Sequence, residues 1–227
     1  MPHIHTDLII SSEISSRFPS LKVLTSRIIN VKVRKQDAEL EKFKNEITND
    51  VRKKYNLDSL KNVASFRAYR DFFWKIGIDP TKTRPAAEAL IRRILHGESL
   101  PCINTLVDAY NLASIKTEIA LAAFDADKLK GKLLMRIAES GEEFIGIGMA
   151  KPMILQGGEI VISDEEKLVA IYPHRDADDT KVTEQTRNVY LLTCGVPGIS
   201  EESLLKASQI AVEFITRFCG KEGKVTE

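Results

Sequence analysis

Hydrophobic positions recur at intervals of three and four residues in several parts of the chain, which is the spacing of one face of an α-helix. The pattern predicts five helices, covering 37–55, 60–76, 83–95, 104 to at least 113, and 200–218. The last is the clearest, because Ser200 is a favourable N-cap and two glutamates follow it in the first turn.

Short apolar runs, many of them alternating with polar residues, predict the strands. We expect strands at 8–10, 21–24, 28–33, 133–137, 143–147, 159–162, 167–172 and 188–193. The later runs are separated only by tight-turn residues such as Gly157 and Gly158, which favours antiparallel hairpins over βαβ units. No repeat and no long linker is visible. The prediction is therefore one α+β domain over 1–227, with an antiparallel-rich sheet packed by helices.

Three polar residues interrupt the central apolar helix. Asn104, Asp108 and Asn111 are spaced i, i+4, i+7, so they share one helical face. A buried amide or carboxylate without a partner costs roughly 1–3 kcal/mol, so this stripe needs partners. These are either other protein groups or a ligand, and both alternatives stay open. We predict that the stripe faces a cavity.

Two other places carry candidate ligand-binding side chains. Arg84 opens the 83–95 helix, where an arginine can clamp a carboxylate or phosphate, or simply face solvent. His174, Arg175 and Asp176 follow a strand, and a loop histidine between charged residues is suited to acid–base chemistry or ligand binding. Thr183 adds a hydroxyl to the same loop, although such hydroxyls more often bond the local backbone. We predict that His174 and Arg84 line the same cavity as the stripe.

The helix at 60–76 combines aromatic residues with Arg67 and Arg70. Aromatics between arginines can stack on nucleic-acid bases. The commoner outcome, which we favour, is a core helix whose arginines reach outward. Arg67 and Arg70 are kept as candidate RNA-binding residues.

Composition narrows the function classes. The chain has 43% hydrophobic and 29% charged residues with a net charge of +1, which is typical of a globular protein and gives no general basic field for duplex DNA. Three cysteines without a CxxC pair, no signal peptide and no long apolar run predict a cytoplasmic protein. Phosphate-loop, dinucleotide-binding, zinc-protease and serine-hydrolase motifs are absent, so no cofactor, metal, membrane or DNA partner is expected.

Three motifs agree in order and spacing with a known family. The first is Asn-x-x-Val-Asp-x-x-Asn at 104–111. The second is Ala-Phe-Asp-x-Asp at 123–127, followed by an arginine-bearing strand and a Gly-Glu turn at 141–142. The third runs from Pro-His-Arg-Asp at 173–176 through spaced threonines to Asn-Val-Tyr-Leu at 188–191.

Over about 84–199 the chain therefore resembles the B-three/B-four domain of the phenylalanyl-tRNA synthetase beta subunit, and most closely its stand-alone relatives. In the synthetase this module removes mischarged tyrosine from the phenylalanine tRNA. The resemblance implies the same α+β fold and a pocket for an amino acid or an aminoacylated adenosine. Two editing-site positions differ, because Ala122 stands where the synthetase has histidine and Leu192 where it has glutamate.

Two functions follow as alternatives. In the first, the chain binds the aminoacylated end of a tRNA, and His174 positions a water that hydrolyses the ester. In the second, it binds a small amino-acid-like molecule without catalysis, with Arg84 on the carboxylate and the Asn104, Asp108 and Asn111 stripe on the amine.

Overall fold

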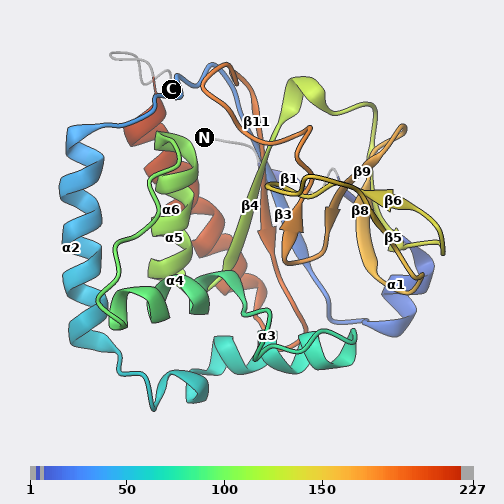
Figure 1. The fold of residues 1–227 in the computed structure, drawn as a ribbon, viewed down its shortest axis with the longest axis horizontal. Coiled ribbons are helices and arrows are strands. Elements are labelled where there is room, and N and C mark those ends of the chain that lie inside the picture. The colour runs from blue at the N-terminus through green and yellow to red at the C-terminus, as the bar shows by residue number, and fades with distance from the viewer. Residues whose placement is uncertain (1–3, 6–7, 221–227) are drawn as a thin grey trace.

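Two β-sheets pack against each other in a computed structural model that describes residues 4, 5 and 8–220 (Figure 1). The first sheet has the antiparallel strand order β1 (Ile4–His5), β3 (Val23–Ile28), β11 (Val189–Cys194), β4 (Ala120–Asp125). The second has the order β10 (Arg175–Asp176), β9 (Leu168–Ile171), β8 (Ile160–Ser163), β5 (Leu133–Ile137), β2 (Leu8–Ile10). Only the β2–β5 pairing in this sheet is parallel. A separate hairpin pairs β6 (Glu143–Phe144) with β7 (Met153–Ile154).

Helices cover the face of the first sheet that points away from the second (Figure 1). These are α2 (Ala38–Lys54), α4 (Ala86–Leu95), α5 (Thr105–Thr117) and α6 (Glu201–Cys219). Helix α3 (Ala64–Lys75) lies across one end of the fold, and the short α1 (Ser12–Arg17) packs on β5. Two 3₁₀ turns complete the set, η1 (Leu60–Asn62) and η2 (Ala126–Lys128).

The central strand β11 is buried on both faces and divides the interior into two cores. Tyr190, Leu192 and Cys194 point into the core between the two sheets, while Val189 and Leu191 point toward the helices. The strand therefore reads as a continuous apolar run, although its side chains alternate between two environments.

The predicted α+β class with an antiparallel-rich sheet is confirmed, and all five predicted helices are present within a few residues of their expected bounds. Asp37 and Ser200 cap α2 and α6 by accepting bonds from backbone N–H groups. The helix expected from 83 begins at Ala86, because Pro85 occupies the cap position. Among the described residues no helix is both long and apolar enough to cross a membrane.

Two strand predictions were wrong. The runs at 21–24 and 28–33 were expected as separate strands, but the chain forms one strand, β3, that ends at Ile28. Strand β4 was missed, because all six of its residues are buried and the pattern lacks polar alternation. Its register with β11 decides much of the site described below.

Candidate functional site

A single row of side chains crosses the inner face of the second sheet. The strand registers pair Ile10 with Met135, Met135 with Ile162, Ile162 with Ala170, and Ala170 with Asp176. Paired residues in adjacent strands share a face, so these five side chains point to the same side. The first four pack into the core between the sheets. Asp176, at the edge strand β10, is the only charged member, and it is half-buried.

The row continues beyond Asp176 into an apolar, exposed segment. The N–H of Ile147 donates to the carbonyl of Asp176 (2.9 Å), and the N–H of Asp178 donates to the carbonyl of Ile145 (2.9 Å). This antiparallel pairing places the Ile145 and Ile147 side chains on the same face as Asp176. They are 47% and 48% exposed. Asp176 thus stands between the apolar core and an exposed apolar wall.

The carboxyl of Asp176 is poorly solvated and unpaired. Within the described residues no backbone N–H, cation or hydroxyl bonds to it. Burial raises its pKa to about 7. Burial, and then the Asp176 charge, also raise the pKa of the Tyr110 hydroxyl on α5 and of the Cys194 thiol on β11. Three elements therefore bring titratable groups within electrostatic reach of one another.

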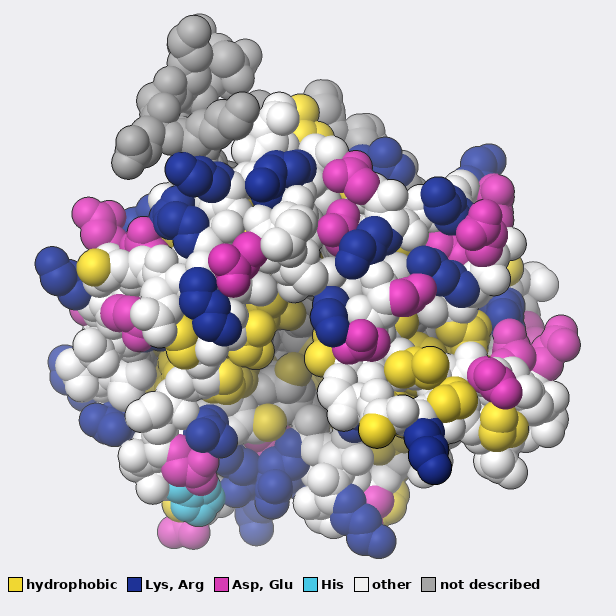
Figure 2. All heavy atoms as spheres, turned by 45° about the horizontal axis from the view of Figure 1, so that its top comes forward, with side chains coloured by type: hydrophobic (Ala, Val, Ile, Leu, Met, Phe, Trp, Pro, Cys, Tyr) yellow, Lys and Arg dark blue, Asp and Glu magenta, His cyan; other side chains and the backbone are white. Residues whose placement is uncertain are grey.

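Figure 2 shows the molecule hollowed in the middle of one face, with hydrophobic side chains on both walls of the hollow. Basic side chains gather at its lower edge in that view. Asp176 and Tyr110 are both half-buried, and a carboxyl and a hydroxyl beside apolar side chains are groups that can fix the polar end of a ligand.

His174 lies two residues before Asp176, at the turn between β9 and β10. Its ring contacts Phe73 edge-on, with centroids 6.2 Å apart, and its Nδ1 is buried without a hydrogen-bond partner. Burial, and then the positive charge of Arg175, lower the His174 pKa to about 4, so the imidazole is neutral at pH 7. The turn is held by a bond from the His174 N–H to the Ile171 carbonyl (3.0 Å). The Tyr172 hydroxyl secures it further by bonding the carbonyl just past β11.

The structure does not bring Arg175 and Thr183 to Asp176. Arg175 points to the opposite face of the sheet and covers Gly146, where a Cβ would lie only 2.7 Å from the Arg175 Cδ. The Thr183 hydroxyl accepts a bond from the Gln185 N–H (3.3 Å), which is the local turn bonding considered above.

The stripe on the central helix is satisfied mostly by protein groups. Asn104 caps α5 and its amide donates to the Val182 carbonyl (3.4 Å). Asp108 is buried and ion-paired with the equally buried Lys44 of α2 (2.7 Å). Asn111 is half-buried, with no bonded side-chain partner among the described residues. Asn104 and Asp108 thus find hydrogen-bond partners within the protein, as in the structural alternative, while Asn111 is left without one in the described part of the chain.

The two arginines of α3 have different surroundings. Arg70 donates two bonds to Glu88 (2.8 Å each), a fully buried carboxylate that also accepts from Arg92 (2.7 Å). The guanidinium of Arg70 thus already has hydrogen-bond partners within the protein, while Arg67 is exposed. Four of the aromatic residues are core residues, as favoured above: Phe66, Tyr69, Phe72 and Phe73. Trp74 is 58% exposed.

Arg84 lines a separate cavity, which we call the α4 cavity. Its volume is about 420 Å³, and its charged and titratable lining residues are Lys82, Arg84, Arg92, Arg93, His96 and Glu98. Neither His174 nor the stripe residues line it. The structure thus does not bring these residues to the cavity of Arg84, since Arg84 precedes α4 while Asp108 turns toward Lys44 of α2.

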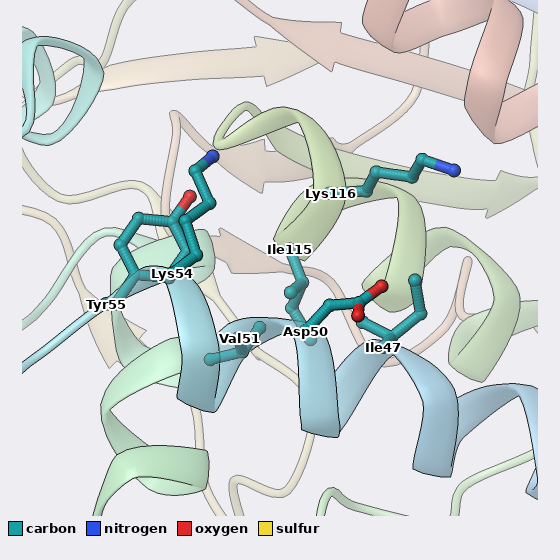
Figure 3. A pocket seen from close by; sticks show the side chains of 7 residues that line it. All are labelled: Ile47, Asp50, Val51, Lys54, Tyr55, Ile115 and Lys116. Carbon is teal, nitrogen blue, oxygen red and sulfur yellow. The ribbon is translucent and has the colours of Figure 1, made fainter.

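A smaller cavity of about 120 Å³ lies between α2 and α5, away from every predicted site residue (Figure 3). Ile47, Val51 and Ile115 form its apolar part, with Lys54 and Lys116 beside them. Asp50 and Tyr55 complete the lining, and none of these residues belongs to the motifs that the sequence singled out.

Within residues 8–220, one group of side chains has the spacing of a metal site. Ligand atoms of Glu41, Cys102 and Asp108 lie within 4.8 Å of one another. The ammonium of Lys44 bonds both carboxylates at 2.7 Å, however, and so supplies the positive charge that a metal ion would bring. The arrangement is explained by this ion-pair network alone.

The two positions that depart from the resembled family are direct neighbours. Leu192 of β11 is the cross-strand partner of Ala122 of β4. Both are buried, 1% and 7% exposed, in the core between the sheets. The histidine and glutamate of the synthetase are thus replaced together by an apolar pair that packs into this core.

Sequence reasoning missed three groups of residues at the Asp176 site and the α4 cavity. Tyr110 lay within a quoted motif but was not singled out. Ile145 and Ile147 alternate as strand residues should, and their exposure was the missing information. The basic residues of α4 were hidden in a helix whose apolar face dominated the pattern.

Comparison with known proteins relates the chain to one family. Residues 68–220 match the B3/4 domain. The chain is 33% identical to the phenylalanine–tRNA ligase beta subunit of Fusobacterium nucleatum over 89 residues. This match covers 39% of this chain and 11% of that protein. It is 30% identical to the same subunit of Bartonella henselae over 165 residues, a match that covers 61% of this chain and 20% of that protein. The chain thus spans a fifth or less of the length of these relatives.

A solved structure shares the fold. The chain superposes on an N-terminal fragment of the phenylalanyl-tRNA synthetase beta subunit from Pyrococcus horikoshii with a TM-score of 0.50 and 13% sequence identity. The match covers 93% of this chain and 48% of the other. At this identity the similarity concerns the fold alone.

Proposed function

Because the chain belongs to the B3/4 domain family, we propose that it binds an aminoacyl group, as carried by the 3′ end of a tRNA, at the site formed by Asp176 and the exposed Ile145 and Ile147 beside it. The observation that carries the proposal is the unpaired carboxyl of Asp176 in an otherwise apolar row. Buried charged groups are normally paired, so a carboxyl without a protein partner suggests a partner from outside.

The α-ammonium of an aminoacyl group supplies the missing charge. A hydrogen bond to a charged group contributes about 1.5–3 kcal/mol, and the poorly solvated surroundings strengthen it. The exposed apolar wall of Ile145 and Ile147 lies on the same face and suits an apolar amino-acid side chain. Tyr110 offers a hydroxyl from the α5 side.

The editing chemistry of the synthetase is not proposed at Ala122 and Leu192, since neither side chain can transfer a proton. Ester hydrolysis remains a second candidate function because of His174, a neutral imidazole with an unbonded Nδ1 two residues from Asp176. In that reaction a water oxygen adds to the ester carbonyl carbon while His174 accepts the water proton. The bond from that carbon to the ribose oxygen then breaks, and the ribose oxygen takes up a proton, which leaves the free amino acid and the tRNA.

The binding proposal is tested with two ligands that differ only in the amine: an amide-linked 3′-aminoacyl adenosine bearing leucine, and its des-amino counterpart. Calorimetry on the full chain should give Asp176→Asn a roughly 10–100-fold weaker affinity for the amine ligand. The des-amino ligand should bind parent and variant alike. Equal losses for both ligands would show that Asp176 does not hold the amine.

Hydrolysis is tested separately with a panel of aminoacylated tRNAs. If His174 is the base, His174→Ala should abolish deacylation while Asp176-dependent binding of the amide ligand persists. A His174→Ala protein that deacylates at the parent rate would remove His174 from the mechanism. Binding of the adenosine ligand without any retention of tRNA would favour the alternative, a small amino-acid-binding protein.

A further inference from the structure

The α4 cavity concentrates positive charge in a protein whose net charge is only +1. Lys82 and Arg84, from the segment before α4, form no direct ion pair among the described residues, although Asp79 is close enough to Lys82 to interact with its charge. Both are exposed, so their side chains can adjust to a ligand.

A buried carboxylate holds a third cation of the cavity in place. Glu88 is fully buried and accepts a bond from the Arg92 Nε at 2.7 Å. The same carboxylate is shared with Arg70, so one negative charge serves two guanidinium groups and one positive charge remains. The terminal nitrogens of Arg92 make no hydrogen bond to the described residues, which leaves them as donors on a fixed side chain.

The one carboxylate that lines the cavity is already neutralised. Glu98 pairs with Arg93 at 2.9 Å, and the Nε of Arg93 is bonded to the Ser99 carbonyl. Lys82, Arg84 and Arg92 therefore leave an excess of positive charge at the cavity, which favours an anionic ligand.

We propose that the α4 cavity binds a phosphate group of an RNA backbone, an inference that rests on the proposed tRNA ligand. Two planar guanidinium groups and an ammonium match the oxygens of a phosphodiester. The volume of about 420 Å³ leaves room for the attached nucleoside, and His96 provides an exposed ring at the cavity. Lys82 and Arg84 are exposed contacts, individually weak, which suits a polymer that joins several contacts better than a small free anion.

The experiment measures binding of fluorescent, uncharged tRNA by the full chain across a series of salt concentrations. The variant is the double substitution Lys82→Ala with Arg84→Ala. The matched control is the double substitution Lys132→Ala with Lys42→Ala, which removes the same charge from exposed positions outside the cavity. Inorganic pyrophosphate serves as the small-anion competitor.

Loss of both contacts should lower the slope of log affinity against log salt by about 1.4, since each phosphate contact to a single strand contributes about 0.7. The affinity should fall at least roughly tenfold, while the control keeps the parent slope. A variant that keeps the parent slope, or a control that loses as much, would overturn the proposal. Competition by pyrophosphate at submillimolar concentration would also overturn it in favour of a small-anion site.

The result of this experiment does not depend on whether Asp176 binds the amine. Uncharged tRNA carries no aminoacyl group, so the salt slope does not depend on the amine contact. A parent protein that binds no tRNA would overturn the phosphate proposal, while the adenosine ligands would still report on Asp176. Conversely, a salt slope that depends on Lys82 and Arg84 would stand even if Asp176→Asn left amine binding unchanged.

Discussion

Replacing Asp176 by asparagine should stabilise the ligand-free protein at neutral and alkaline pH. The folded-state pKa of Asp176 is raised to about 7, against a value of 3.8 for a solvated aspartate. Between these two values the folded protein holds a proton that the unfolded chain has released. The contribution of Asp176 to stability is therefore most favourable below about pH 4, and it declines as the pH rises through 7.

The magnitude follows from the size of the shift. At about 1.36 kcal/mol per pKa unit, the rise from 3.8 to about 7 corresponds to roughly 4 kcal/mol. Because Asp176 is half-buried, residual solvation lowers this figure, and we expect Asp176→Asn to gain between about 1 and 4 kcal/mol at pH 8. At pH 4 the carboxyl is protonated in the folded parent, so the variant and the parent should differ little.

The assay is urea unfolding of parent and variant from pH 4 to pH 8, compared as a difference at each pH. The difference matters because the His174 pKa is lowered to about 4, which makes stability rise with pH between 4 and 6.5 and opposes the Asp176 effect. His174 is present in both proteins, so most of its contribution cancels. Asp71→Asn on the exposed surface of α3 is the control. A stability difference that stays constant within 0.5 kcal/mol over this range (about the error of such measurements) would refute the reasoning.

Three further predictions concern the core and the apolar wall. Leu192→Glu should lose at least about 3 kcal/mol at pH 7, and less near pH 4, because it places a carboxylate in the core between the sheets; a pH-independent loss in urea unfolding would contradict this. Asp108→Ala should cost about 3 kcal/mol by leaving the buried Lys44 without its buried partner, and a loss below 1 kcal/mol by thermal or urea unfolding would mean that Glu41 alone suffices. Ile147→Ser should change stability by less than about 0.5 kcal/mol yet weaken the leucyl ligand roughly fivefold by calorimetry, whereas an unchanged affinity would place the amino-acid side chain elsewhere.

Local patterns were sufficient for the helices and for most strands. The caps at Asp37 and Ser200, and the spacing of apolar residues behind them, act within a few residues of one another and are visible in any single stretch of chain. Strand β4 escaped because a strand buried on both sides has no alternation to detect. The break in the expected 28–33 strand likewise depends on where its partner β11 begins, at Val189.

The central-helix stripe shows how far such reasoning extends to a site. The helical periodicity correctly indicated that Asn104 and Asp108 need hydrogen-bond partners. It left their identity open, and Lys44 lies 64 residues earlier on another helix. The motif resemblance indicated the family, while the direct pairing of Ala122 with Leu192 is a matter of strand register.

The surroundings of Asp176 are determined by the tertiary structure alone. In the sequence this residue is one acid in a polar loop, with several others close by. Its direct cross-strand neighbours are Ala170 of β9 and Ile147 after β6, and the rest of the apolar row comes from β8, β5 and β2; only hydrogen-bond register aligns these segments. Desolvation depends on every atom nearby regardless of its position in the chain. The local pattern could therefore identify candidate residues, but only the packed sheets make one of these carboxyls an unpaired group in an apolar surrounding.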